Sequence, residues 1–110
     1  MALVLTVNTD SWNRQVDALA TSVAGLVPVV KGNGYGFGRD WLAKRATSVA
    51  TTTAKFIAVG TVFEVSSIPA QCTPVVLTPS LELPDNLRDD AILTVGSIAH
   101  IEAVASTNKP

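Results

Sequence analysis

One lysine in this sequence stands where an amine could act as a nucleophile. Lys31 ends an apolar run that extends from Leu26 to Val30. A lysine at the end of a buried strand lies at the rim of a pocket, partly out of water. Such surroundings lower the pKa of an amine, and part of the neutral amine is then free to attack carbonyl groups. The segment therefore predicts a lysine that condenses with carbonyl compounds.

The residues after Lys31 form a glycine-rich loop that carries one hydroxyl group. Glycines occupy positions 32, 34, 36 and 38, where they permit positive φ angles and the close approach of a bulky anion. Tyr35, the only tyrosine of the chain, can donate a hydrogen bond to a phosphate oxygen. A lysine and a phosphate donor on one loop are the parts of a pyridoxal 5'-phosphate site.

Other glycine-rich motifs do not fit this loop. The dinucleotide fingerprint Gly-x-Gly-x-x-Gly fails because Phe37 and Arg39 stand where its last glycine is needed. A phosphate-binding loop of the Walker type needs a glycine directly before the lysine, and Val30 is there. The remaining alternative is a flexible turn after a strand, with a solvated lysine.

The decapeptide from Val29 to Gly38 resembles the cofactor-lysine segment of the alanine racemase family, Val-Val-Lys-Ala-(Asn/Asp)-Ala-Tyr-Gly-His-Gly. Gly32 and Gly34 replace alanines, and Phe37 replaces the histidine. The glycines are expected to loosen the loop without removing a chemical group. Weaker similarity covers nearly the whole chain, in segments that resemble the second, third and fourth barrel strands of the family: 56–61 followed by Glu64, 74–77, and 93–97.

The resemblance implies a pyridoxal-phosphate-dependent amino-acid racemase with a small amino acid as substrate. It implies that Lys31 forms the Schiff base and moves the Cα proton on one face, and that Tyr35 binds the phosphate. Val29 and Thr78 are then expected beside the cofactor. In the family the opposite-face base is a tyrosine from another domain, supplied by the partner subunit of a homodimer. The alternatives are a non-catalytic pyridoxal-phosphate-binding protein, a decarboxylase or aldolase on the same barrel, or an inactive remnant without a ligand.

Strand-like and helix-like segments alternate along the chain, which predicts an α/β fold with parallel strands and right-handed crossover helices. The expected strands are residues 2–7, 26–31, 56–60, 74–78 and 91–95, and the expected helices are 10–24, 39–50, 62–67 and one from Ser97. A complete (β/α)₈ barrel takes roughly 250 residues. The resemblance therefore implies that residues 1–110 are the first half of a TIM-type barrel, with about four parallel strands, and a fragment of a longer enzyme. A compact α/β sandwich and a barrel completed by two copies are the alternatives.

The composition narrows the class of protein further. The net charge is -1 and only 15% of the residues are charged, so nucleic-acid binding has no electrostatic support. The apolar start is too short for a signal peptide or a membrane span, which predicts a cytoplasmic protein. Cys72 is expected to be a buried thiol without metal ligands nearby. Glu64 is expected to fix a turn, and His100 to lie on the exposed side of the last helix.

Overall fold

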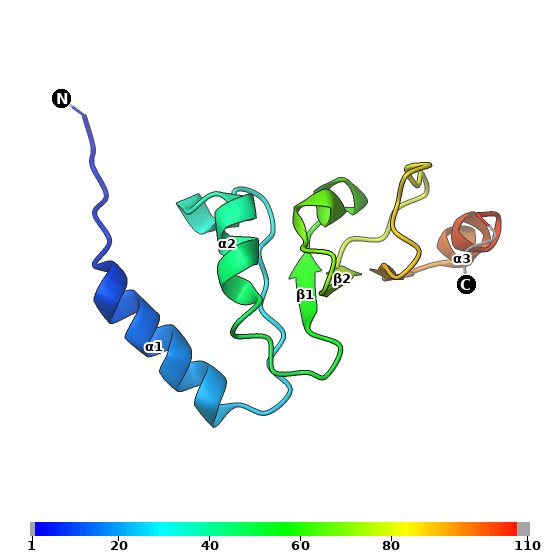
Figure 1. The fold of residues 1–110 in the computed structure, drawn as a ribbon. Helices are drawn as coiled ribbons and strands as arrows, with labels where there is room; N and C mark the ends of the chain where they lie inside the picture. Colours follow the sequence, from blue (N-terminus) through cyan, green and yellow to red (C-terminus); the bar gives the residue numbers. More distant parts are fainter. Residues whose placement is uncertain (1, 108–110) are drawn as a thin grey trace.

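The computed structural model describes residues 2–107 and shows a small parallel sheet with helices along it (Figure 1). Helix α1 stands at one end of the molecule and helix α3 at the other (Figure 1). The α/β class is therefore confirmed. In chain order the elements are α1 (Thr9–Ser22), the 3₁₀-helix η1 (Gly34–Gly36), α2 (Arg39–Ala46), β1 (Phe56–Val59), the 3₁₀-helix η2 (Val62–Ser67), β2 (Thr73–Val76), β3 (Ile92–Leu93) and α3 (Ile98–Ala105).

The sheet has the order β1-β2-β3, and all its strands are parallel. The strand expected at 26–31 is reduced to a parallel bridge between Val29 and Ala58. Two hydrogen bonds form this bridge, from Ala58 N to the carbonyl of Pro28 (2.8 Å) and from Val30 N to the carbonyl of Ala58 (2.9 Å). Proline lacks an N–H donor, which limits regular pairing in this segment. Four parallel segments thus lie side by side in the order in which they occur in the chain.

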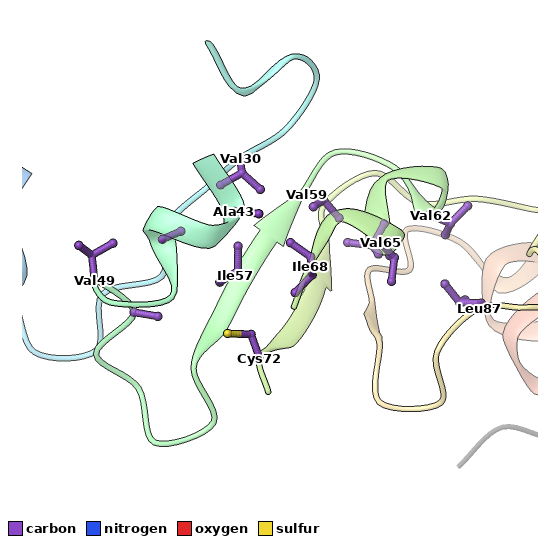
Figure 2. Packing of buried hydrophobic residues seen from close by; sticks show 13 residues of the cluster. Val30, Ala43, Val49, Ile57, Val59, Val62, Val65, Ile68, Cys72 and Leu87 are labelled. Carbon is purple, nitrogen blue, oxygen red and sulfur yellow. The ribbon is translucent and has the colours of Figure 1, made fainter. Parts of the chain in front are cut away.

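One face of the sheet carries the core. Side chains alternate between the two faces of a strand, and the pairing register puts Val30, Ile57, Val59 and Val76 on the same side. These four residues are buried and belong to one cluster with residues of α2 and η2 (Figure 2). The core therefore lies between the sheet and the two helices that follow the first two parallel segments.

The opposite face carries a second apolar row. Val29, Ala58, Val75 and Ile92 are paired directly across the four segments, so they share the other side of the sheet. None of the four belongs to the core cluster of the described residues. Ala58 is buried, but 44% of the surface of Ile92 is exposed. The sheet therefore has one covered face and one apolar face that is only partly shielded.

The prediction of a first strand at residues 2–7 is wrong. This segment is extended and exposed, and Leu3 and Leu5 show 102% and 86% of their surface. No backbone hydrogen bond within the described part of the chain joins it to the sheet. β-branched composition favours a strand, but a strand also needs a neighbour for its N–H and C=O groups. Residues 2–7 pair with no strand among the described residues.

The helices lie where the sequence predicts them, but the residues at which they begin and end differ from the prediction. Helix α1 is capped by Asn8, whose Oδ1 accepts a hydrogen bond from Ser11 N (3.1 Å), and not by Asp10 or Ser11 as expected. Helix α2 ends at Ala46, four residues before the expected end, and turns follow. The expected start of α3 near Ser97 is confirmed, and Ser97 Oγ caps this helix by accepting a hydrogen bond from His100 N (3.2 Å).

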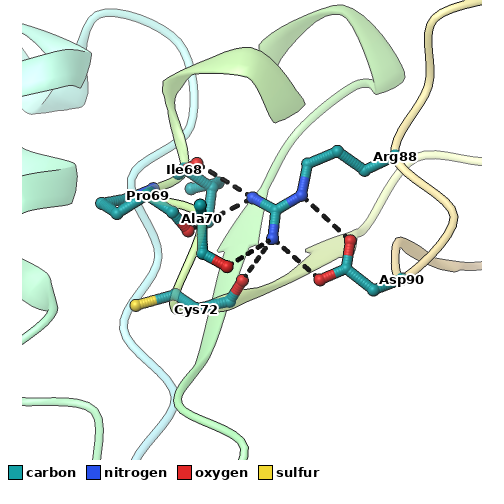
Figure 3. Close-up of polar contacts among 6 residues, drawn as sticks. All are labelled: Ile68, Pro69, Ala70, Cys72, Arg88 and Asp90. Carbon is teal, nitrogen blue, oxygen red and sulfur yellow. Dashed lines mark hydrogen bonds and ion pairs between the residues drawn. The ribbon is translucent and has the colours of Figure 1, made fainter.

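The connection from β2 to β3 contains no helix between residues 77 and 91, and Arg88 holds it in place. Its guanidinium donates hydrogen bonds to the carbonyls of Ile68, Pro69, Ala70 and Cys72, and it pairs with Asp90 at 2.8 Å (Figure 3). The expected local pairing of Arg88 is thus confirmed. Cys72 is 1% exposed, as expected for a buried thiol. Within residues 2–107, no helix has both the length and the apolar character needed to cross a membrane.

Candidate functional site

The predicted lysine lies at the carboxyl edge of the parallel sheet. Lys31 follows the bridged segment and Gly60 follows β1. A Cβ atom on Gly60 would lie 3.4 Å from Cβ of Lys31, so the two residues are side by side. Thr78 continues the same edge beyond β2, because its N–H donates to the carbonyl of Gly60 (2.8 Å). The edge where parallel strands end is also where α/β proteins bind ligands.

Lys31 is exposed, whereas the sequence predicts a lysine partly out of water. The physical reason is its place on the sheet. Lys31 is two residues after Val29, so the alternation of side chains puts it on the face that α2 and η2 do not cover. Among the described residues, none makes a hydrogen bond or an ion pair with its amine. The amine is therefore accessible to a molecule in solution.

The loop after Lys31 is shaped by residues with positive φ. Gly32, Gly34, Gly36 and Gly38 have φ angles between 61° and 93°. Tyr35 also has a positive φ, 57°, which is uncommon for a residue with a side chain. The prediction that Gly32 and Gly34 loosen the loop is therefore not supported. In this conformation an alanine at position 32 or 34 would be strained. The glycines fit a turn of fixed shape.

The backbone of Asn33 organises this turn. Its carbonyl accepts hydrogen bonds from Gly36 N (3.3 Å) and Gly38 N (2.9 Å). An asparagine in a turn is expected to act through its side-chain amide, but here the backbone carbonyl accepts both hydrogen bonds. Tyr35 stands outside the turn with 63% of its surface exposed. No hydrogen bond in the described chain joins its hydroxyl to Lys31, Val29 or Thr78. Lys31 and Thr78 thus lie at one edge of the sheet, and Tyr35 lies in the loop beyond it.

Gly32, directly after Lys31, is held at both of its backbone groups. Its N–H donates to Oε1 of Glu64 (2.5 Å), and its carbonyl accepts from Nη1 of Arg39 (2.7 Å). Arg39 and Glu64 also face each other at 3.9 Å. We call these contacts the Gly32 clamp. The sequence predicted a turn-fixing role for Glu64, and the acid does bind its own turn through N and Oγ1 of Thr61 (2.8 and 2.9 Å).

The pKa of the Glu64 carboxyl is set by opposing effects. Burial raises this pKa, because it disfavours the charged form. The hydrogen bonds from Gly32 N, from Thr61 Oγ1 and from Thr61 N lower it, and so does the charge of Arg39. The lowering effects prevail, so the pKa lies below its ordinary value and Glu64 is ionised at neutral pH.

Phe37 has no chemical role in this geometry and a clear packing role. Its ring lies 5.1 Å from the ring of Trp12 in α1 and 5.6 Å from the ring of Trp41 in α2. The sequence predicts core or helix–sheet packing for Trp12, and the structure places its ring against the loop and α2. The spacing of these residues in the sequence, 25 positions from Trp12 to Phe37, gives no signal for the contact. Arg39 was likewise not singled out, since nothing local marks a contact with Gly32.

A shallow hollow of about 340 Å³ lies beside Lys31, lined by Gly32, Asn33, Arg39 and Asp40. It is open to solvent and combines one cation, one anion and backbone groups. The N-terminal end of α2 forms one of its walls, and such an end favours anions.

Comparisons with protein-family models, curated proteins and solved structures found no significant match to this chain.

Proposed function

We propose that this chain carries the cofactor lysine of a pyridoxal-phosphate-dependent amino-acid racemase of the alanine racemase type. The observation that carries the proposal is the position of Lys31. Its amine is accessible, its backbone is held firmly through Gly32, and it stands at the carboxyl edge of a parallel sheet next to Gly60. The similarity of residues 29–38 to the family's lysine segment supplies the identity of the cofactor.

The order of the strands supports a barrel of the (β/α)₈ type. In such a barrel every strand pairs with the next one along the chain, whereas a doubly wound sheet reverses its order at a switch point. The four parallel segments here are neighbours in chain order. Helices cover one face, and branched side chains dominate the row on the other, as they do inside a barrel. We therefore propose that this sheet is the first half of a barrel wall.

Each named residue has a role in this proposal. Pyridoxal phosphate, when bound, supplies a ring that withdraws electrons from the Cα atom of the amino acid. Lys31 would hold the cofactor through its amine, and this amine would take or return the Cα proton on one face. The exposed side chain of Tyr35 would donate its hydroxyl to the phosphate. Val29 lies on the same face of the sheet as Lys31, and Thr78 lies at the same edge. A small amino-acid substrate, a homodimer and a cytoplasmic location complete the proposal, and all three come from the resemblance or the sequence.

A non-catalytic pyridoxal-phosphate-binding protein is the second candidate, and one observation favours it. Racemisation needs a base on each face of the Cα atom. The chain has a single tyrosine, and the proposal already uses Tyr35 for the phosphate. A chain that attaches the cofactor through Lys31 without a second base exchanges the Cα proton or only stores the cofactor. The two candidates share Lys31 and differ in whether inversion follows.

The attachment test uses pyridoxal phosphate followed by borohydride, with the modified peptides found by mass spectrometry. We expect the phosphopyridoxyl mass on Lys31 at low cofactor concentration, and its loss in Lys31→Ala. Lys44, an exposed lysine on α2, is the matched control, and Lys44→Ala should leave the modification unchanged. Equal modification of Lys31 and Lys44 at every concentration would refute the assignment. Formation of D-alanine from L-alanine by the loaded protein supports the racemase, and attachment without inversion supports the second candidate.

A further inference from the structure

We propose that Arg39 and Glu64 are the positioning residues of this site, and that the Gly32 clamp sets where the Lys31 amine lies. The role of that amine rests on the proposed function. The clamp itself rests on contacts between described residues, so the two can fail separately. Neither Arg39 nor Glu64 contacts the amine, and both act through the backbone of the next residue.

The first step of the argument is that the clamp holds both polar groups of one residue. Glu64 accepts the N–H of Gly32 at 2.5 Å, and Arg39 donates to its carbonyl at 2.7 Å. The N–H of Gly32 belongs to the peptide bond that contains the carbonyl of Lys31. That carbonyl in turn accepts a hydrogen bond from Gly34 N (3.1 Å). Fixing Gly32 therefore fixes the backbone from which the side chain of Lys31 extends.

The second step is that the clamp connects successive units of the sheet. Glu64 belongs to η2, directly after β1, and it also binds Thr61 at the end of that strand. Arg39 belongs to the first turn of α2, and its Nε donates to Ser67 Oγ at the end of η2 (2.8 Å). The loop after the first parallel segment is thus held against the loop after the second. This contact places Lys31 relative to Gly60.

The third step is that the residues of the clamp pack closely around Gly60. A Cβ atom on Gly60 would lie 3.0 Å from Oε2 of Glu64 and 3.4 Å from Cβ of Lys31. A side chain at position 60 would press on the acid, and it would be in van der Waals contact with the lysine. Glu64 is the only charged residue of η2, and the cation that faces it is Arg39 of α2 at 3.9 Å. The acid therefore acts on Lys31 through the backbone of Gly32 and not through the amine.

The test measures hydrogen exchange of single amides by NMR. Glu64→Ala should accelerate exchange at Gly32, which loses its acceptor, and also at Gly34, which reports the place of the Lys31 carbonyl. The expected acceleration is on the order of tenfold, about the net effect of one charge-assisted hydrogen bond. Asp90→Asn, which weakens a carboxylate–arginine pair elsewhere, is the matched control and should leave both amides unchanged. Unchanged exchange at Gly34 in Glu64→Ala would overturn the proposal.

Substitute variants and a second measurement complete the test. If Glu64→Ala does not fold, Glu64→Gln and Arg39→Lys take its place, and either must accelerate exchange at Gly34 while exchange at Val59 in the sheet stays slow. Glu64→Gln keeps an oxygen for Gly32 N, so its effect should lie between those of wild type and Glu64→Ala. In the attachment experiment, Glu64→Ala should raise the cofactor concentration that half-modifies Lys31 by on the order of tenfold and leave Lys44 unchanged. A wild-type protein without selective Lys31 modification refutes the proposed function, and the exchange result still decides the clamp.

Discussion

The ring of Trp12 lies 5.1 Å from the ring of Phe37, centroid to centroid, and this contact joins α1 to the loop that carries Lys31. Trp41 completes the cluster at 5.8 Å from Trp12 and 5.6 Å from Phe37. The guanidinium of Arg45 lies over the ring of Trp12 at 5.7 Å, a cation–π contact. Phe37 therefore serves as a packing residue that holds α1 and α2 against the loop.

Phe37→Ala should weaken the attachment of α1 to the rest of the molecule. Two aromatic contacts are lost, and each adds about 0.5–1.5 kcal/mol beyond the area that it buries. We expect the free energy of unfolding in urea, followed by far-ultraviolet circular dichroism, to fall by roughly 1–2 kcal/mol. Phe37→His keeps a ring, so its free energy of unfolding should fall by less. An equal loss in both variants would show that the ring contacts contribute nothing.

Gly34→Ala should be the most damaging glycine substitution in the loop. Gly34 has a φ of 61°, and its added Cβ would lie 3.1 Å from both N and Cα of Arg39, which are backbone atoms of α2. A left-handed conformation costs an alanine roughly 1–2 kcal/mol, and the close approach adds to this cost. Gly32→Ala is the control, because its φ is 63° and nothing lies within 4 Å of its added Cβ. Thermal unfolding of both variants tests the difference, and a larger loss for Gly32→Ala would contradict it.

The contribution of Glu64 to stability should depend on pH with a defined sign. The pKa of its carboxyl in the folded protein lies below the ordinary value of 4.5. The carboxylate therefore stabilises the fold fully above pH 4.5, and this stabilisation is lost as the pH falls through the lower folded pKa. At neutral pH we expect Glu64→Gln to lower the free energy of unfolding by roughly 1–2 kcal/mol. The difference between wild type and variant should shrink in acid, and a difference that grows there would refute the assignment.

Arg88→Lys should destabilise the protein although the charge is kept. The guanidinium reaches four carbonyls and one carboxylate at the same time, and a lysine ammonium has three donors without the planar arrangement. Several backbone carbonyls would lose their donor, and we expect a loss of about 2–3 kcal/mol in chemical denaturation. Arg14→Lys is the matched control, since Arg14 is exposed and, within residues 2–107, its side chain hydrogen bonds to Ser11 alone (3.1 Å). Similar losses in the two variants would contradict the role of Arg88.

Local patterns in the sequence predicted those elements whose causes are local. The apolar residues Trp12 and Val16 are one helical turn apart, as expected for a helix over 10–24, and the last helix starts near Ser97 as expected. The short helix before Pro69 is present, in 3₁₀ form. The spacing of Thr61 and Glu64 predicted a fixed turn, which their hydrogen bonds confirm. In all these cases the partners lie within four residues of one another, so the sequence contains the relevant information.

Features that depend on distant partners could not be predicted in this way. Residues 2–7 have the composition of a strand, but strand formation depends on a free sheet edge, which composition does not report. Glu64 reaches Gly32 across 32 positions, and Arg88 reaches Ile68 across 20. His100 is partly buried and not exposed as expected, because its ring nitrogen contacts Gly96 N and Ser97 Oγ. The exposure of Lys31 follows from which sheet face α2 and η2 cover, and this too is a property of the assembled fold.

The aromatic cluster also determines what the protein's own fluorescence can report. Both tryptophans of the chain, Trp12 and Trp41, belong to it, so the ultraviolet emission arises at one end of the molecule. That emission follows the docking of α1 onto the loop and is insensitive to the pairing of β2 with β3. An unfolding curve recorded by emission therefore separates from one recorded by ellipticity whenever α1 detaches first, and the gap between the two midpoints measures how independently that helix moves.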